Sequence, residues 1–283
     1  MVEGPHFERP PVEEVALSVQ FDAPKGLSLA HLGAFWSTQT ATYPGIRSVE
    51  PLPTVNEIFG KGVWLPTSLQ FAFSNDPDCR IQMTSHDDEW MCQLQRNRLI
   101  VNWRKRKSDY PRFEQTLIRF GAAWESWSAF LRAQDIALPV PRLWEVVYVN
   151  RIFQEKLWSS VGDWPQMLPG LWSGPFAEIA GATLKGLIGQ WVWESEEPPI
   201  RLFVEPKPAR IDQPSPQDAM LLSLTARGPV GKPDEKLPES TVTVQKAIEN
   251  GLTSGHDFIV KVFDLITSPK AKEAWKRHAP NSN

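Results

Sequence analysis

The spacing of apolar residues predicts a strand near the start of the chain and a meander after it. Residues 14–21 place Val15, Leu17, Val19 and Phe21 on one side of an extended segment, with polar or small residues on the other. This alternation is typical of a strand with one buried face. Four short strands are predicted over residues 68–74, 80–85, 89–95 and 98–103, and turns rich in Asn and Asp separate them. Such turns favour an antiparallel meander.

A helical period is found on either side of the meander. Residues 28–40 place apolar residues at helical spacing, and Ser28 is suited to cap the first turn. A stronger helix is predicted from Pro111, where large apolar side chains recur along one face: Phe113, Leu117, Phe120, Trp124, Trp127 and Leu131. A stripe of this kind must cover an apolar surface, and the meander is the simplest candidate.

The second half of the sequence repeats this order. Strands are predicted over residues 143–153, 183–194, 200–206 and 219–227, with a short helix over 161–168. A long amphipathic helix is predicted over residues 240–267, although Gly251 and Gly255 weaken its middle by about 1 kcal/mol each. Adding 131 to the residue numbers places Glu14-Val15 on Glu145-Val146, and Tyr110, where the first long helix opens, on Thr241.

We therefore predict an α+β fold of two similar halves, residues 1–140 and 141–283. Each half has the order strand, helix, antiparallel meander and long helix. Together the halves are expected to form a curved antiparallel sheet that helices cover on one face. This order resembles the TATA-binding-protein-like arrangement, in which two halves share one curved sheet with both long helices on its convex side. The resemblance concerns topology alone and carries no function.

The bulk composition argues against several classes of protein. Hydrophobic residues make up 41% of the 283, which is enough for a sizeable core. A formal net charge of -3 gives no overall positive field for a polyanion. Cys79 and Cys92 lack the spacing of a zinc or redox motif and are expected to remain reduced thiols. Because we recognise no signal peptide and no apolar run of about 18 residues, we expect a cytoplasmic protein without membrane contact.

Several short motifs are distributed along the chain. They are Pro11-Val12-Glu13-Glu14, Arg98-Leu99-Ile100-Val101-Asn102-Trp103, Tyr110-Pro111-Arg112-Phe113-Glu114 and Val147-Tyr148-Val149-Asn150, followed by His256, Phe263, Ile266-Thr267 and Trp275. Together they resemble an uncharacterised, sporadically distributed family of bacterial proteins, and the resemblance spans nearly the whole chain. It implies a bacterial source and a patchy distribution of the kind that accompanies mobile or defence-linked genes. It implies no activity.

The histidines and acidic residues form no recognisable catalytic or metal-binding set. No two of His6, His31, His86, His256 and His278 have the i, i+2 or i, i+4 spacing of a metal site. The acidic residues within 87–89 and 194–197 fall between predicted strands and lack the spacing of a calcium loop. We therefore predict no metal site, no cofactor and no assigned catalytic residue. His256 stands out only because it belongs to the motifs of the resemblance.

The strongest local feature is a basic run, Arg104, Lys105, Arg106 and Lys107, directly after Trp103. One interpretation is a phosphate-binding patch beside an aromatic platform, as in the binding of single-stranded nucleic acid. The other, which we favour, is a solvated connector to the long helix. Asn102 and Asn150 are polar residues within apolar strands. Each needs hydrogen-bond partners if buried, and so either locks the sheet or contacts a ligand.

Three functional hypotheses follow, and the sequence leaves the oligomeric state open under all of them. The first is a non-catalytic binding or adaptor protein, which engages a protein partner or a small ligand through a sheet face or a groove between the halves. Its candidate contacts are Asn102, Arg104, Asn150 and His256. The second is an enzyme, a hydrolase or nucleotide-processing protein, with a site around His256, Asn102 and Asn150. The third is nucleic-acid binding through Arg104 to Lys107. The sequence favours the first, because no nucleophile, base and metal ligands converge in it.

Overall fold

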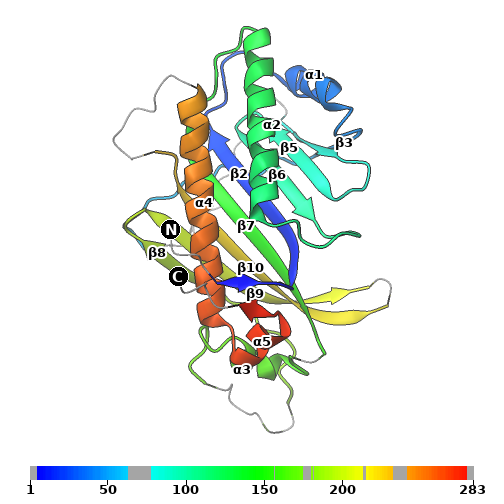
Figure 1. Ribbon diagram of the computed structural model, residues 1–283, viewed down its shortest axis with the longest axis vertical. Helices are drawn as coiled ribbons and strands as arrows, with labels where there is room; N and C mark the ends of the chain where they lie inside the picture. The colour runs from blue at the N-terminus through cyan, green and yellow to red at the C-terminus, as the bar shows by residue number, and fades with distance from the viewer. Residues whose placement is uncertain are drawn as a thin grey trace.

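One antiparallel sheet of nine strands forms the centre of the protein (Figure 1). The computed structural model describes residues 5–62, 78–155, 157–174, 180, 182–212, 215–231 and 241–278. Across the sheet the strands lie in the order β3 (Gly45–Val49), β4 (Arg80–Thr84), β5 (Trp90–Gln95), β6 (Arg98–Arg104), β2 (Val12–Phe21), β7 (Pro141–Phe153), β10 (Gln217–Pro229), β9 (Ile200–Ile211) and β8 (Trp191–Ser195). Together with the helices, this sheet confirms the predicted α+β class.

The meander of the first half is present as β4, β5 and β6, and the predicted strand over residues 68–74 lies outside the described residues. The prediction missed β3, because residues 45–49 were taken as loop. This edge strand has no buried face, and Ile46 is 40% exposed, so it carries no alternating pattern. The turn at residues 96–97 is present, but the left-handed residue of the meander is Asp88, with a φ of 58°.

The strands of the second half differ from their predicted lengths. Residues 183–190 have no regular structure, so the strand predicted over 183–194 begins only at Trp191, as β8. In contrast, β9 continues past Pro206 and Pro208. Strand β8 pairs with β9 only as far as Val204, so beyond that residue β9 is an edge strand on this side. An edge position tolerates proline, because no neighbouring strand needs its missing N–H.

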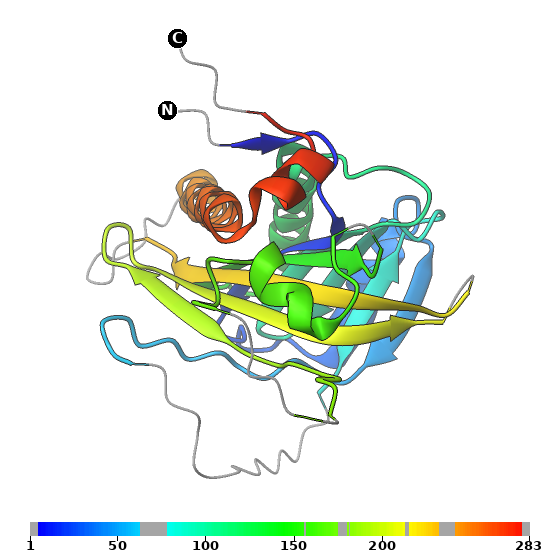
Figure 2. The same cartoon turned by 90° about the horizontal axis from the view of Figure 1, so that it is seen from below.

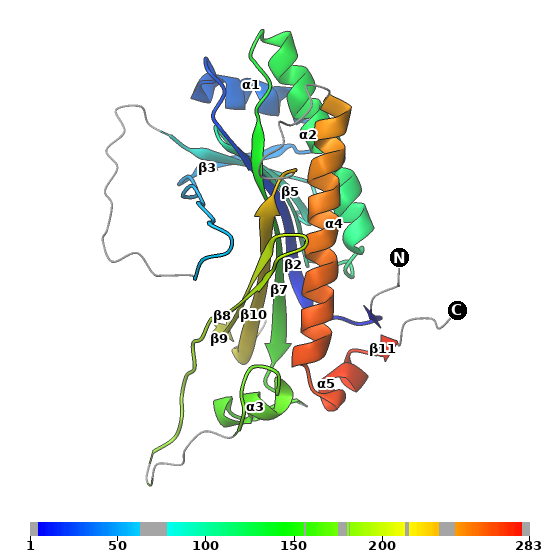
Figure 3. The ribbon, with the colours of Figure 1, turned by 90° about the vertical axis from the view of Figure 1, so that its left-hand side faces the viewer.

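Two long helices, α2 (Phe113–Ala133) and α4 (Thr241–Ile266), lie side by side on one face of the sheet (Figures 1 and 3). Helix α2 contacts β2 and β6, whereas α4 contacts β7, β9 and β10. The shorter elements are α1 (Leu29–Gln39), the 3-10 turn η1 (Val161–Asp163), α3 (Trp164–Met167) and α5 (Pro269–Ala274). Among the described residues, no helix combines the length and the apolar character that crossing a bilayer requires.

The main core lies between the sheet and these two helices. Trp103 on β6 and the α2 side chains Trp124 and Trp127 are at most 2% exposed. Trp144 of β7 points toward α4, where the chain has Gly251 and Gly255. A side chain at either glycine would meet the Trp144 indole, so these glycines allow the helix to approach the sheet closely.

The opposite face of the sheet is polar, and residues 50–62 cross it (Figures 2 and 3). The amide of Gln95 accepts from the backbone N–H of Leu52 and donates to its carbonyl, at 2.9 and 3.0 Å. The amide of Gln20 does the same with Val55, at 2.8 Å for both bonds. This face of the sheet therefore binds an extended stretch of backbone through side-chain amides.

The same segment ends in a buried ion network. Glu57 bridges the guanidinium groups of Arg201 and Arg227, with N–O distances of 2.7 and 2.9 Å. Arg227 also contacts Glu145, and Arg201 contacts Glu194. The side chains of Glu57 and Arg201 are only 7% and 5% exposed, so the network fixes residues 57–61 against β9 and β10.

The two ends of the described chain pair with each other, which the sequence did not predict. Strands β1 (His6–Phe7) and β11 (Arg277–His278) form a two-stranded antiparallel sheet beside α4. The ring of Phe7 packs on Phe263 of α4, with centroids 5.2 Å apart. We call residues 5–12 the N-terminal arm, because they cross from the β11 pairing to the start of β2.

Candidate functional site

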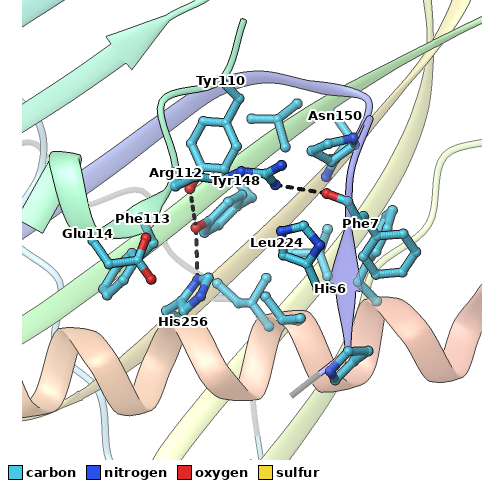
Figure 4. A pocket seen from close by; sticks show the side chains of 16 residues that line it. His6, Phe7, Tyr110, Arg112, Phe113, Glu114, Tyr148, Asn150, Leu224 and His256 are labelled. Carbon is cyan, nitrogen blue, oxygen red and sulfur yellow. Dashed lines mark hydrogen bonds between the residues drawn. The ribbon is translucent and has the colours of Figure 1, made fainter. Parts of the chain in front are cut away.

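A pocket of about 230 Å³ opens between the N-terminal arm, the start of α2, helix α4 and strands β7 and β10 (Figure 4). We call it the arm pocket. Most of its wall is apolar and includes Phe7, Val12, Phe113, Leu224, Ile259 and Phe263. Its polar groups come from His6, Tyr110, Arg112, Glu114, Tyr148, Asn150 and His256. An apolar wall with a few convergent polar groups is the usual composition of a small-molecule site.

Two tyrosines and a histidine form a hydrogen-bonded series in this pocket (Figure 4). The hydroxyl of Tyr148 lies 2.8 Å from the hydroxyl of Tyr110 and 2.8 Å from Nδ1 of His256. Burial raises the pKa of both phenols. Both hydroxyls therefore stay protonated at neutral pH and act as hydrogen-bond groups of fixed orientation.

His256 is held rigidly by its neighbours. Its ring stacks on Phe113, with centroids 4.1 Å apart and an interplanar angle of 3°. Burial lowers the pKa of His256 to about 4, so the imidazole is neutral at pH 7. Because Nδ1 is occupied by Tyr148, the ring presents its remaining polar atom, Nε2, to its surroundings as either a donor or an acceptor, depending on the tautomer.

Arg112 links the mouth of the arm pocket to the N-terminal arm. Its guanidinium donates to the carbonyls of Phe7 and Glu8, at 2.8 and 3.2 Å. Arg112 is also the N-cap of α2 and has a φ of 78°, which is costly for a residue with a side chain. Backbone strain of this kind persists where the surrounding structure enforces it, and it is concentrated at functional sites.

Asn150 is the second predicted site residue that the structure places here. Its Nδ2 donates to the Leu222 carbonyl at 3.1 Å, and the side chain is buried. No other side-chain hydrogen bond of Asn150 is present among the described residues, so its Oδ1 remains as an acceptor at the pocket wall. Asn150 and His256 therefore belong to one site, as the sequence analysis proposed for them.

Asn102 and Arg104 lie elsewhere, on the polar face of the sheet. They line a second pocket, of about 370 Å³, together with Glu14, Gln93 and Glu145. The separation follows from strand geometry, because successive side chains of β6 point to opposite faces. Trp103 points into the core beneath α2, so its two neighbours point away from it. The sequence analysis grouped Asn102 with Asn150 and His256, and the structure separates them.

The basic run is largely tied to the β4–β5 turn. The guanidinium groups of Arg104 and Arg106 both contact the carboxylate of Asp88. The carboxylate of Glu89 accepts from the backbone N–H groups of residues 107 and 108, at 3.1 and 2.7 Å. Only Lys105 and Lys107 extend into solvent without such a partner among the described residues. Arg104 and Arg106 therefore pair within the protein, and the role of the basic run in nucleic-acid binding stays a prediction.

Sequence reasoning missed Tyr110, Arg112 and Tyr148, because tyrosines and an arginine at these spacings match no catalytic or ligand motif. They do belong to the short motifs of the resemblance, and the structure brings three of those motifs together at the arm pocket with His256. Among the described residues, no group of three or more His, Cys, Asp and Glu side chains is arranged to hold a metal ion. No family model, no curated protein and no solved structure matches the chain.

Proposed function

We propose that this protein binds a small ligand in the arm pocket, and that binding rather than catalysis is its role. The ligand has a mostly apolar body for the aromatic and aliphatic wall, and one polar group for Nε2 of His256 and Oδ1 of Asn150. The hydrogen-bonded series Tyr110–Tyr148–His256 carries this proposal, because it aims rigid, neutral polar groups into an otherwise apolar pocket.

Three observations support binding over the enzymatic alternative. The pKa of His256, about 4, makes it a weak base at neutral pH. The pKa of Tyr148 is raised, so this hydroxyl is no nucleophile. Glu114 lines the pocket, but it is exposed and has no hydrogen bond to His256. A hydrolytic site needs a base, an orienting carboxylate and an activated nucleophile in contact, and the described residues of the pocket offer no such set.

The internal duplication remains our proposal for how the pocket arose, and the register of the central strands supports it. The offset of 131 relates Val15 to Val146 (15 + 131) and Leu17 to Tyr148 (17 + 131). Strands β2 and β7 pair Val15 with Tyr148 and Leu17 with Val146. A twofold axis through the Ala16–Val147 pair exchanges these two pairs, as a duplicated sheet requires. The arm pocket uses residues of both predicted halves.

The decisive experiment is a screen by ligand-observed NMR with aromatic fragments that carry one carboxylate or amide. The test variant is Tyr148→Phe, which removes one hydroxyl at the centre of the series. The matched control is Tyr43→Phe, because Tyr43 is also a buried tyrosine but lies outside the arm pocket. We expect fragment hits whose affinity falls about tenfold in Tyr148→Phe, which corresponds to one buried hydrogen bond, and is unchanged in the control.

Two results would argue against the proposal. A screen without hits that map to residues 110–114, 148 and 256 would remove the arm pocket as a binding site. Chemical conversion of a bound fragment that His256→Gln abolishes would favour the enzymatic alternative instead. An adaptor role through a protein partner remains a prediction that this screen does not address.

A further inference from the structure

The second pocket lies on the face of the sheet opposite α2 and α4, and no step of the proposed function uses it. We call it the amide pocket. Its floor is apolar, with Met91, Ile100, Val147 and Val149. Its polar groups are Glu14, Arg80, Gln82, Gln93, Asn102, Arg104 and Glu145. A pocket with this many polar side chains suits a polar ligand, and their arrangement indicates which kind.

Three amide side chains, on β4, β5 and β6, form a directed row that begins at Arg47 of β3 and ends at Glu14 of β2. Nε of Arg47 donates to Gln82, and Nε2 of Gln82 donates to Gln93, at 2.6 and 2.8 Å. The row continues from Nε2 of Gln93 to Asn102 and from Nδ2 of Asn102 to the carboxyl group of Glu14, at 2.7 and 2.6 Å. A guanidinium can only donate, so the direction of every amide in the row is fixed. Each amide keeps a second N–H for a ligand.

The two ends of the amide pocket have side chains of opposite charge. At the β4 end, Arg80 lines the pocket, its side chain has no hydrogen bond or ion pair among the described residues, and its Nε is fully buried. At the β2 end is Glu14, whose pKa is raised by burial. The ends are three strand spacings apart, or about 14 Å. The unpaired guanidinium of Arg80 is suited to bind an anionic group of a ligand, and the carboxyl group of Glu14 is suited to bind a hydrogen-bond donor or a cation.

The same face of the sheet already binds peptide backbone within this protein, through side-chain amides. Gln95 and Gln20 each hold the N–H and the carbonyl of one residue in the segment 50–62. Arg98 adds a bond to the Pro53 carbonyl at 3.0 Å. Side-chain amides can match the paired donor and acceptor of a peptide unit, and this face uses that match twice.

We propose that the amide pocket binds a short extended peptide of about four residues, with its terminal carboxylate on Arg80 and its terminal ammonium at Glu14. A length of about 14 Å corresponds to about four extended residues. The free N–H groups of Gln82, Gln93 and Asn102 bind the peptide carbonyls between the two ends. This proposal does not depend on the ligand of the arm pocket.

The test uses affinity-selection mass spectrometry with a random-sequence tetrapeptide library in three forms: free acid, C-terminal amide and N-acetylated acid. We expect the free acids to be retained, and each blocked form to bind about tenfold more weakly, because each loses one charge-assisted contact. Arg80→Gln should remove the difference between acid and amide. Arg210→Gln is the matched control, because Arg210 is an exposed arginine on the same sheet and lies outside the amide pocket.

The outcomes separate clearly. Retention of the free acids that falls in Arg80→Gln and persists in Arg210→Gln supports the proposal. Equal retention of acid, amide and acetylated forms overturns it, as does the absence of any retained tetrapeptide at millimolar concentration. Asn102→Leu supplies a second test that leaves Arg80 in place, and unchanged peptide retention in this variant also overturns the proposal. Failure here leaves the fragment screen of the arm pocket untouched.

Discussion

The indole of Trp144 occupies the space that a side chain on Gly251 would need. An added Cβ would lie within 3.0 Å of the Cδ1, Nε1 and Cγ atoms of this indole, closer than Cβ atoms approach in proteins. Gly255, one helical turn later, contacts the same ring. Helix α4 therefore has its glycines where the Trp144 indole projects from the sheet, and they set the distance between helix and sheet at this point.

Replacing Gly251 with alanine should destabilise the protein, although alanine is the better helix former. The intrinsic gain is about 1 kcal/mol, and overpacking against the indole costs about 1 to 3 kcal/mol or more. We expect a net loss of about 1 to 2 kcal/mol in the free energy of unfolding, measured by urea denaturation. The control is Gly33→Ala in α1, where an added Cβ meets nothing within 4 Å. That variant should gain up to about 1 kcal/mol, and a similar gain for Gly251→Ala would contradict our account of the Trp144 contact.

Glu57 should be among the most costly polar residues to replace. Glu57→Gln removes the negative charge between Arg201 and Arg227, both of which are largely buried. Each arginine retains one other carboxylate, so we expect a loss of about 2 to 3 kcal/mol rather than the larger cost of an isolated buried charge. Proteolysis within residues 50–62 should also accelerate, because the segment loses its anchor. Both effects are measurable on the purified protein, by denaturation and by limited proteolysis.

The matched control for Glu57 is Asp22→Asn. Asp22 pairs with Arg142, but both side chains are at least 60% exposed. Exposed ion pairs contribute between zero and about 1 kcal/mol, so the control should lie close to the wild type. Equal losses for the two variants would show that burial of the Glu57 network does not determine its contribution.

Much of the fold could be predicted because it depends on local periodicity. The strand around Leu17 has alternating apolar residues, turns rich in Asn and Asp mark the meander, and the stripe on α2 has one apolar face. Strand β3 could not be predicted, because a polar edge strand has no buried side to impose a pattern. From the sequence, Gly251 was interpreted as a residue that weakens the helix. Its contact with Trp144 could not be predicted, because the two residues are distant in sequence and meet only in the folded packing.

The candidate site was only partly predictable. Asn150 could be singled out as a polar residue in an apolar strand, and His256 as part of the motifs of the resemblance, and the structure places both at the arm pocket. Tyr148 could not, because a tyrosine in a strand ordinarily signals a core position. Its role follows from its pairing with Tyr110 and His256, which lie on separate elements. The grouping of Asn102 with this site failed because the sheet face of a residue depends on its register.

Arg104 should contribute to stability rather than to nucleic-acid binding. Its side chain is 13% exposed and contacts both the carboxylate and the carbonyl of Asp88. We expect Arg104→Ala to cost about 1 kcal/mol of unfolding free energy, whereas Lys105→Ala, a change at an exposed neighbour, stays within about 0.5 kcal/mol. We also expect no salt-dependent binding of a single-stranded oligonucleotide. Binding that weakens with salt and is lost when Lys105 and Lys107 become alanine would restore the nucleic-acid hypothesis.

His256 should make the protein less stable as the pH falls below neutral. In the unfolded chain its pKa is about 6.5, whereas burial in the folded protein lowers the pKa to about 4. Between these values the unfolded state binds a proton that the folded state does not, so the free energy of unfolding decreases as the pH falls through this window. The full difference amounts to about 3 kcal/mol. This loss of stability is absent above pH 7 and complete below about pH 4.

Other groups titrate in the same window with the opposite sign, so the contribution of His256 must be isolated by substitution. Burial raises the pKa values of Glu13, Glu14 and Asp257, and such carboxyl groups stabilise the folded state as the pH falls. Urea denaturation at several pH values should therefore give a shallower loss for His256→Gln than for the wild type. His86→Gln, in an exposed turn, should follow the wild-type curve. If the curve of His256→Gln instead parallels that of the wild type between pH 7 and pH 4.5, burial does not keep the imidazole neutral. The neutral hydrogen-bonded series Tyr110–Tyr148–His256 is then not formed, and ligand binding in the arm pocket loses its basis.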